Sequence, residues 1–441
     1  MSTTDSAVTQ GNTASSFQIS KSYGIYILIL LWFAGLLRFM DIQVFAVVLE
    51  AVRTEFHLSD TQAGILSGFA FALFYATLGI PLAFLADRYN RRNILSIVLT
   101  IWSGMTALCG ATMGYASLFL ARMGVGIGEA GAMPTINSLL ADYFPPSKRG
   151  TIFAIFNTSI PAGVFCGFMI GGWVLEHYGW RVTFYTYGIP GVILAILIRL
   201  TFREPPRGFS ENIAASLESV GFIDTLKHLW QRRSYRHLVM ATTIMTVGAY
   251  GSGIWIPTFF TRIHGLTIGN VTVWLAWLYG VGGIIGSLLG GRLTDQLSNK
   301  NNDARWYVKI PAIAALMIMP FSFFVYLWPE PYTALKVHFG TTVLMHMYLG
   351  PAYGTVQSLA GAKRRAMAAG INLLAINFLG YTLGPFLVGY ANDYLHGIYG
   401  DHSIRYSMLG LVVIAYTWAA IHFFLAARNL REDIAKARED S

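Results

Sequence analysis

Charged residues are scarce in this chain: Asp, Glu, Lys and Arg together make up 12% of its 441 residues. A soluble domain has about a quarter. Hydrophobic residues make up 54% of the chain, and its mean hydropathy is +0.51. The low charge content excludes an ordinary soluble protein and indicates that lipid surrounds most of the chain.

Cysteine is also scarce. The two cysteines, Cys109 and Cys166, fall inside predicted membrane helices, which excludes a disulfide framework. The alternating hydrophobicity of membrane β-strands is absent, which excludes an outer-membrane barrel. No arrangement of a nucleophile with a base is present, so we predict that the protein is not an enzyme and uses no cofactor.

Two motifs resemble ligand sites, but their surroundings argue against that interpretation. The glycines of GVGIGEAG (124–131) lie in a predicted membrane helix and do not follow a strand, which excludes a dinucleotide-binding loop. His346 stands between two methionines, but no second ligand motif lies nearby, so we predict no metal site.

The N-terminal segment lacks the features of a signal peptide. Residues 1–22 are polar, carry no basic n-region and no small-residue cleavage site, and the apolar stretch that follows is too long for an h-region. We therefore predict a disordered cytoplasmic tail at 1–22, followed by a retained membrane helix.

Long apolar runs divide the chain into helices of membrane length, each of about 20 residues or more. Ser59 and Gln62 form a capping-box pattern at the start of the second helix. The sequence predicts an all-α membrane protein with twelve transmembrane helices, at about 23–48, 61–86, 93–113, 117–143, 150–175, 180–201, 236–262, 269–294, 306–328, 333–358, 366–391 and 403–427.

The net charge of +9 could suggest nucleic acid as a partner, but the positions of the basic residues indicate membrane orientation instead. If the N-terminus is inside, five basic residues are external: Arg53, Arg181, Arg262, Lys336 and Arg405. The cytoplasmic segments then hold Lys21, Arg88, Arg91, Arg92, Lys148, Arg149, Arg203, Arg207, Lys227, Arg232, Arg233, Arg236, Arg292, Lys300, Arg305, Lys309, Lys363, Arg364, Arg365, Arg428, Arg431, Lys436 and Arg438. We predict a multi-pass protein of the cell (inner) membrane with both termini in the cytoplasm and no nucleic-acid partner. A lipid-surface role for the basic 203–236 loop stays open.

The two halves of the chain resemble one another. LAFLADRYNRRN (82–93) corresponds to GGRLTDQLSNK (290–300), so that Asp87 matches Asp295. SKRGTIFAIFN (147–157) corresponds to AKRRAMAAGIN (362–372), so that Asn157 matches Asn372. The repeats predict two six-helix bundles in the same orientation, at 23–201 and 236–428, joined by a cytoplasmic linker at 202–235 and followed by a cytoplasmic tail at 429–441.

Two parallel six-helix bundles resemble the major facilitator superfamily. ALADR with the basic residues after it resembles the loop motif of that superfamily, although Ala83 and Asn90 stand where glycine is usual. RMGVGIGEA, running on to LLADYFPPSKRG, resembles the spinster branch, as does Asp41 in the first helix, and the short termini are similar to those of bacterial members. The resemblance implies a transporter that works by alternating access, and spinster proteins are implicated in export of lysolipids and sphingosine-1-phosphate.

Charged residues lie deep inside the first and fourth predicted membrane helices. Arg122 and Glu129 are about 7 Å and about 18 Å below the outer end of the fourth helix, and Asp41 reaches a depth similar to that of Arg122. We therefore expect Asp41 to pair with Arg122, with Glu129 two turns deeper. Since a charge near the bilayer centre costs at least ~2.5–3.5 kcal/mol, such residues usually face a cavity or a partner. Asp41, Glu129 and Arg122 are the predicted proton-coupling residues, and a fixed ion pair that only holds the helices together is the alternative. For Arg38 both roles stay open.

The second half offers aromatic and amide side chains where the first half has charges. We predict a cavity with one charged wall and one largely apolar wall, and substrate-binding residues Arg122, Glu129, Asn157, Trp255, Asn372, Asn377 and Tyr381. By resemblance to the superfamily, a cytoplasmic gate would latch the inner side through Asp87, Arg88, Arg91, Arg92, Asp142, Arg149 and Asp295.

The function that the sequence favours is a proton-coupled transporter, a monomer, that exports or translocates an amphiphilic lipid such as a lysophospholipid or sphingoid phosphate. A proton-coupled transporter of small organic anions or drugs is an alternative within the same class. An uncoupled lipid flippase is an alternative of another class. The embedded carboxyl groups favour coupling, and no ring of pore-lining charges is present.

Overall fold

A computed structural model describes residues 20–206 and 221–439. The predicted N-terminal tail and the middle of the predicted linker lie almost wholly outside the described residues. Within these ranges the chain is helical and contains no strand. The prediction of an all-α membrane protein is confirmed.

The first half of the chain forms eight helices. They are α1 (Lys21–Glu55), α2 (Asp60–Ser67), α3 (Phe69–Arg88), α4 (Arg91–Cys109), α5 (Tyr115–Ala130), α6 (Ala132–Tyr143), α7 (Pro146–Asn157) and α8 (Ser159–Thr201). Ser59 caps α2 through the predicted capping box with Gln62.

A short helix, α9 (Phe222–Trp230), precedes the second half. The second half consists of α10 (Arg233–His264), α11 (Ile268–Asn301), α12 (Trp306–Leu327), α13 (Pro331–His346), α14 (Leu349–Ala360), the 3₁₀ turn η1 (Ala362–Arg364), α15 (Arg365–Ala375), the π-helical turn η2 (Ile376–Gly380), α16 (Tyr381–Tyr399), the 3₁₀ turn η3 (Gly400–His402) and α17 (Ser403–Glu439).

Each of the twelve predicted membrane helices has a counterpart in the structure. Eight helical stretches of the described chain are long and apolar enough to cross a membrane, and two of them, 146–201 and 367–437, each contain two predicted helices. The helix pairs α5–α6 and α13–α14 match the remaining two predictions. Within α8, the chain turns between two predicted helices at Gly179, whose φ of +83° is a conformation that glycine adopts without a steric penalty.

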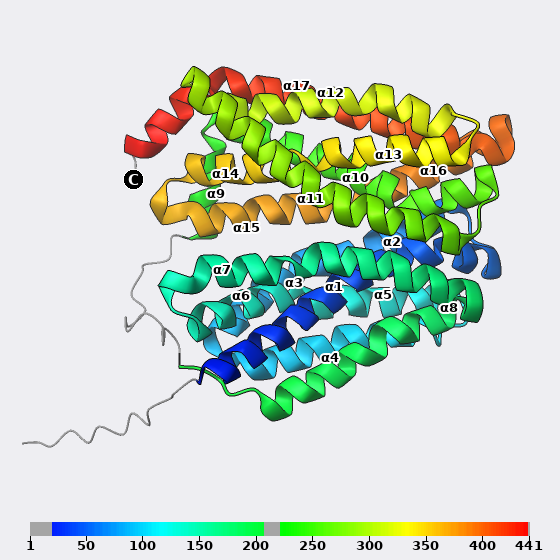
Figure 1. Cartoon of the computed structure of the whole chain (residues 1–441), viewed down its shortest axis with the longest axis horizontal. Coiled ribbons are helices and arrows are strands. Elements are labelled where there is room, and N and C mark those ends of the chain that lie inside the picture. The colour runs from blue at the N-terminus through cyan, green and yellow to red at the C-terminus, as the bar shows by residue number, and fades with distance from the viewer. Residues whose placement is uncertain (1–19, 207–220, 440–441) are drawn as a thin grey trace, which may run out of the picture.

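The helices form two bundles, α1–α8 and α10–α17, which lie one above the other in Figure 1. They meet most closely at the end of the molecule where α1 finishes and α10 finishes, which we call the junction end. The opposite end, where α1 begins and α17 finishes, is the tail end. In Figure 1 the ribbons of the two bundles touch toward the right, at the junction end.

Glycines allow the backbones of the two bundles to touch at the junction end. A Cβ atom added to Gly64 of α2 would lie 2.6 Å from the carbonyl oxygen of Pro385 in α16, and one added to Gly68 would lie 2.7 Å from that of Tyr381. A Cβ on Gly172 of α8 would overlap Thr272 of α11. At Gly64 and Gly68 no side chain separates the helices, so the two bundles meet backbone to backbone. At Gly172 the side chain of Thr272 packs against the backbone of α8.

Candidate functional site

Four charged side chains form one buried cluster inside the first half. Asp41 and Arg38 lie on α1, and Arg122 and Glu129 lie on α5, with 1%, 5%, 3% and 1% of their surfaces exposed. The four charges sum to zero when all are ionised. Since isolated charges are costly in an apolar interior, this balance allows the cluster to stay buried.

Arg38 forms the ion pair of this cluster with Glu129. Its Nε atom lies 3.2 Å from a carboxylate oxygen of Glu129. Its Nη2 atom donates a hydrogen bond of 3.1 Å to the Tyr75 hydroxyl, and its guanidinium lies over the rings of Phe39 and Tyr75 at 5.0 and 5.6 Å. Arg38 is therefore held from several sides and joins α1, α3 and α5.

The predicted pair of Asp41 with Arg122 is wrong in this structure. Arg122 places its guanidinium over the rings of Phe45 and Phe71, at 5.0 and 5.4 Å, and makes no ion pair within 4.0 Å of any described carboxylate. The negative faces of the two rings stabilise the cation in place of a carboxylate. Arg122 remains the main positive neighbour of Asp41.

Asp41 is the carboxyl group of the cluster that forms no ion pair. Both of its carboxyl oxygens are buried and accept no hydrogen bond of ordinary geometry from the described residues. Its polar neighbours are Arg122, Thr106 and Glu129, and the hydroxyl of Thr106 is itself buried without a partner. A buried carboxyl without strong partners is a typical site for a group that gains and loses a proton.

Tyrosines from the second half reach the same cluster. The rings of Tyr250 in α10 and Tyr381 in α16 stack with centroids 3.7 Å apart, and both lie within electrostatic range of Arg38. The second half thus brings two tyrosines near the charged cluster of the first half. Tyr381 was among the predicted substrate residues. The sequence analysis missed the role of Tyr75. The sequence around a tyrosine in an apolar stretch does not show whether its hydroxyl contacts a charged group or its ring only packs against other side chains.

The other predicted substrate residues have different surroundings. Asn372 of α15 is fully buried, accepts a long hydrogen bond of 3.4 Å from Thr242, and leaves its amide nitrogen without a partner. Asn377 lies in the π-helical turn η2 and is half-buried, and Asn157 is exposed at the end of α7. Trp255 is fully buried and donates its indole N–H to the Pro385 carbonyl at 3.0 Å. Trp255 therefore joins α10 to α16, and its one polar group is already used.

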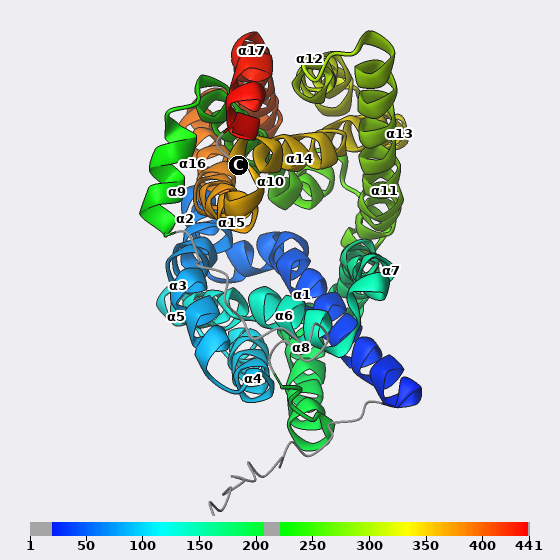
Figure 2. The same cartoon turned by 90° about the vertical axis from the view of Figure 1, so that its left-hand side faces the viewer.

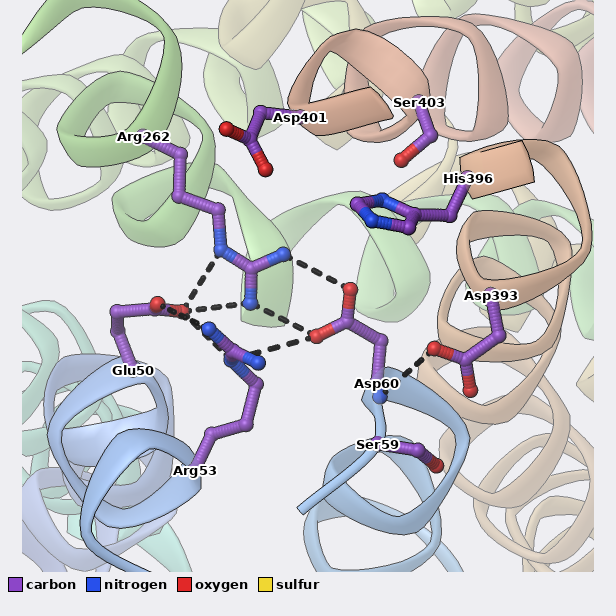
Figure 3. Close-up of a pocket in the computed structure, with 9 residues that line it drawn as sticks. All are labelled: Glu50, Arg53, Ser59, Asp60, Arg262, Asp393, His396, Asp401 and Ser403. Carbon is purple, nitrogen blue, oxygen red and sulfur yellow. Dashed lines mark hydrogen bonds and ion pairs between the residues drawn. The ribbon is translucent and has the colours of Figure 1, made fainter. Parts of the chain in front are cut away.

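A second polar site closes the junction end, and the sequence analysis did not predict it. Arg262 of α10 binds Glu50 of α1 at 2.6 Å and Asp60 of α2 at 2.7 Å, so one guanidinium joins the two halves (Figure 3). Arg53 binds Glu50 at 2.9 Å and Asp60 at 3.5 Å. These side chains line a pocket of about 300 Å³ together with Ser59, Asp393, His396, Asp401 and Ser403.

Asp393 of α16 caps a helix of the opposite half. Its carboxylate accepts hydrogen bonds from the backbone N–H groups of Asp60 and Thr61, at 3.0 and 2.8 Å, and from the Thr61 hydroxyl at 2.5 Å. The N-terminal N–H groups of a helix have no partner within the helix and favour a negative charge. If the halves separate, the N–H groups in the first turn of α2 lose this carboxylate and must donate their hydrogen bonds to water.

The predicted gate residues lie at the tail end. Arg91 is buried, forms ion pairs with Asp142 and with Glu204 at 2.9 Å, and also binds Ser138. The backbone N–H of Arg92 donates to Glu204 at 2.8 Å. All of these contacts stay within the first half, and Glu204 is a member that the sequence analysis missed, since its position after α8 resembled a solvated linker.

The remaining gate candidates have varied settings. Arg149 donates to the Ala141 carbonyl at 2.8 Å, Arg88 is exposed, and Asp295 accepts a hydrogen bond of 2.7 Å from Tyr307 within the second half. The side chain of Asp87 lies outside the described residues. A latch between the halves at this end stays a prediction.

Among the described residues, no group of three His, Cys, Asp or Glu side chains is placed to hold a metal ion. His346 directs its Nδ1 atom to the Thr342 carbonyl at 2.8 Å, as a packed helix residue does.

Comparison with known proteins gives a consistent result. A family model described as Major Facilitator Superfamily matches residues 31–385. An MFS-type efflux pump of Mycolicibacterium smegmatis is 30% identical over 409 residues, which cover 91% of this chain and 92% of the pump. Protein spinster homolog 3 of Danio rerio is 26% identical over 415 residues, which cover 87% of this chain and 80% of the homolog. The crystal structure of a bacterial homolog to the human lysosomal transporter Spinster, in an inward-facing and unoccupied conformation, matches with a TM-score of 0.86 and 28% identity, and covers 94% of this chain and 99% of that one.

Removing one partner of the central ion pair should destabilise the fold. Arg38→Met leaves Glu129 as an uncompensated buried carboxylate, and the expected loss is about 3–5 kcal/mol in the free energy of unfolding. The double variant Arg38→Met/Glu129→Gln should recover most of that loss, because it removes both charges. A double-mutant cycle in detergent measures the coupling energy. The matched cycle of Arg122→Met with Glu129→Gln should show a smaller coupling, and equal couplings in the two cycles would contradict the assignment of Arg38 as the partner.

Removing the cap across the halves should favour opening of the junction end. Loss of a helix cap costs about 1 kcal/mol, so Asp393→Ala should raise the ratio of open to closed molecules about fivefold. Spin labels at Thr54→Cys on α1 and Gly397→Cys on α16 report the distance across this end. Asp401→Ala is the control, since Asp401 lines the same pocket and has no described partner. An unchanged distance distribution in Asp393→Ala would show that the cap does not hold the halves.

Proposed function

The chain belongs to the major facilitator superfamily and is a transporter, not an enzyme, and on this premise we propose that it moves an amphiphilic lipid by proton-coupled alternating access. The earlier resemblance to the spinster branch is confirmed by the spinster homologs and by the solved bacterial structure. The proposed cargo is a lysophospholipid or a sphingoid phosphate.

One observation carries the proton coupling: a neutral cluster of four buried charges lies where tyrosines of the two halves meet. Protonation of Asp41 or Glu129 leaves the cluster with a charge of +1. The guanidinium of Arg38 is then attracted less strongly by the carboxyl groups of the first half. It therefore attracts the tyrosine hydroxyl groups or an anionic ligand more strongly. Proton binding thereby changes the interaction between the halves, which is the requirement for coupling.

The proposed orientation follows from the basic residues. Their excess in the predicted inner segments favours a cytoplasmic location of both termini in the cell (inner) membrane. The tail end then faces the cytoplasm and the junction end faces outside. We further propose a monomer of two bundles, residues 23–201 and 236–428, with the cytoplasmic linker at 202–235.

The chemistry of the side chains around the charged cluster supports a lipid cargo. The first half contributes a charged wall, and the second half contributes tyrosine and asparagine side chains on a largely apolar wall. A head group would contact the Arg38–Glu129 pair together with Tyr250 and Tyr381. We propose Arg38 for this role in place of the predicted Arg122, because Arg122 is enclosed by two phenylalanine rings. The lipid cargo is also what the resemblance to the spinster branch implies.

A second candidate cargo is a small organic anion or a drug. Two relatives whose names give organic anions as cargo, a cis,cis-muconate transport protein of Acinetobacter baylyi and a probable galactarate/D-glucarate transporter of Bacillus subtilis, favour the anion. An uncoupled flippase is the third possibility, and it differs from the others in needing no titratable group. The experiments below distinguish the three.

Neutralising either carboxyl group should abolish pH-driven transport. In proteoliposomes with an imposed pH gradient, Glu129→Gln and Asp41→Asn should lose the acceleration that the gradient gives to movement of a fluorescent lysophospholipid. Glu55→Gln is the control, because Glu55 pairs with Arg181 outside the cluster. If both cluster variants keep the response to pH, the carboxyl groups are structural only, and the uncoupled flippase becomes the better description.

The head group should determine binding more than the tail length does. Burying a CH₂ group from water gains about 0.8 kcal/mol. The tail of a membrane lipid is already surrounded by hydrocarbon, so most of this gain is absent when the tail moves from the bilayer into the protein. Tyr250→Phe and Tyr381→Phe should each weaken lysophospholipid binding about two- to tenfold, the value of one hydrogen bond, while two carbons more or less in the tail should change it less.

Ligand-dependent thermal shifts measure these affinities. Tyr279→Phe is the control, because its hydroxyl contacts His338 inside the second half. A short hydrophilic anion that binds as tightly as the lysophospholipid would replace the lipid with the organic-anion cargo.

A further inference from the structure

Helix α9 has no role in the site described above. It packs against α10, α14 and α15 of the second half, where Thr225 and Leu229 are fully buried. Figure 2, which views the tail end, shows α9 at the outer edge of the second half.

The opposite face of α9 is apolar as well. Ile223 and Trp230 are 62% and 51% exposed. Together with the exposed Lys227 they occupy positions i, i+4 and i+7, which form one stripe along a helix. A helix that buries one apolar stripe in the protein and exposes a second one is typical of a helix that lies between the protein and a membrane surface.

The surrounding contacts fix α9 at the end of a membrane helix. α9 ends at Trp230, and α10, a candidate membrane span, begins at Arg233. The carboxylate of Asp433 in α17 accepts hydrogen bonds from the backbone N–H and the hydroxyl of Ser234, at 2.8 and 2.5 Å, and Arg232 donates to the Asp433 carbonyl. The corner between α9 and α10 is therefore anchored to α17.

Two exposed basic residues, Lys227 and Arg233, lie near this stripe. Lys227 makes no ion pair among the described residues, and Arg233 is exposed. The acidic neighbours are Asp224 on α9 and Glu432, which already pairs with Lys436 at 2.7 Å. Lys227 and Arg233 beside an exposed tryptophan match the chemistry of anionic phospholipid head groups above a hydrocarbon layer.

We infer that α9 binds anionic phospholipids of the surrounding bilayer, with Lys227 and Arg233 on the head groups and Ile223 and Trp230 at the boundary of the acyl chains. This is a lipid site on the outside of the second half, separate from the proposed path of the cargo. It fixes the linker to the membrane surface where the linker enters the second half.

Fluorescence quenching by brominated lipids tests the inference in the intact protein. The protein is placed in nanodiscs of phosphatidylcholine and phosphatidylglycerol in which one lipid or the other has brominated chains. The difference in emission between wild type and Trp230→Phe isolates the signal of Trp230. Quenching of that signal should be several-fold stronger with brominated phosphatidylglycerol, since each basic residue contributes about fivefold to anionic-lipid binding.

The variant Lys227→Gln/Arg233→Gln should make the two brominated lipids equally effective on Trp230. Trp418 is the matched control: it is 50% exposed in the middle of α17, and the difference between wild type and Trp418→Phe should show no preference between the lipids. Equal quenching of wild-type Trp230 by both lipids, or no quenching by either, would overturn the inference.

Discussion

The burial of two carboxyl groups and two guanidinium groups within one six-helix bundle is the constraint on which the site depends. An embedded charge costs at least ~2.5–3.5 kcal/mol on insertion scales, so Asp41 and Glu129 are tolerated only because Arg38 and Arg122 balance them. The balance is unequal. Glu129 has a direct ion-pair partner in Arg38, whereas Asp41 forms no ion pair and lies near an arginine that is enclosed by Phe45 and Phe71.

The junction end depends on a different balance. The side chains of Arg262, Glu50 and Asp60 are 16%, 28% and 10% exposed, so this network is more accessible to water than the Arg38–Glu129 pair, whose side chains are 7% and 0% exposed. The contacts of Gly64 and Gly68 bring backbones together without interlocking side chains. Water can reach the ion pairs at this end, which favours a closure that can reverse.

The sequence predicted the helices well, because a run of about 20 apolar residues has few alternatives to a membrane helix. It also identified the embedded charges. It could not identify their partners, since position along a helix determines the height of Asp41, Arg38 and Arg122 but not which side chain bends toward which. Their similar depth in the membrane predicted that Arg122 pairs with Asp41. In the structure the guanidinium of Arg122 lies over the rings of Phe45 and Phe71 instead. The junction network was missed because Glu50, Asp60 and Asp393 lie at helix ends, where charges are usually solvated.

The placement of ion pairs relative to the two halves is consistent with alternating access. The buried pair, Arg38–Glu129, lies wholly within the first half, so separation of the halves does not break it. Breaking a buried pair costs about 3–5 kcal/mol, and such a pair across the halves would oppose every transport cycle. The second half meets this pair through Tyr250 and Tyr381, whose neutral hydroxyl groups can exchange partners with water or a ligand. Pairs that do cross between the halves, those of Arg262, occur where the pocket lets water in. The most deeply buried ion pair therefore stays within one half, and the ion pairs between the halves are those that water can reach.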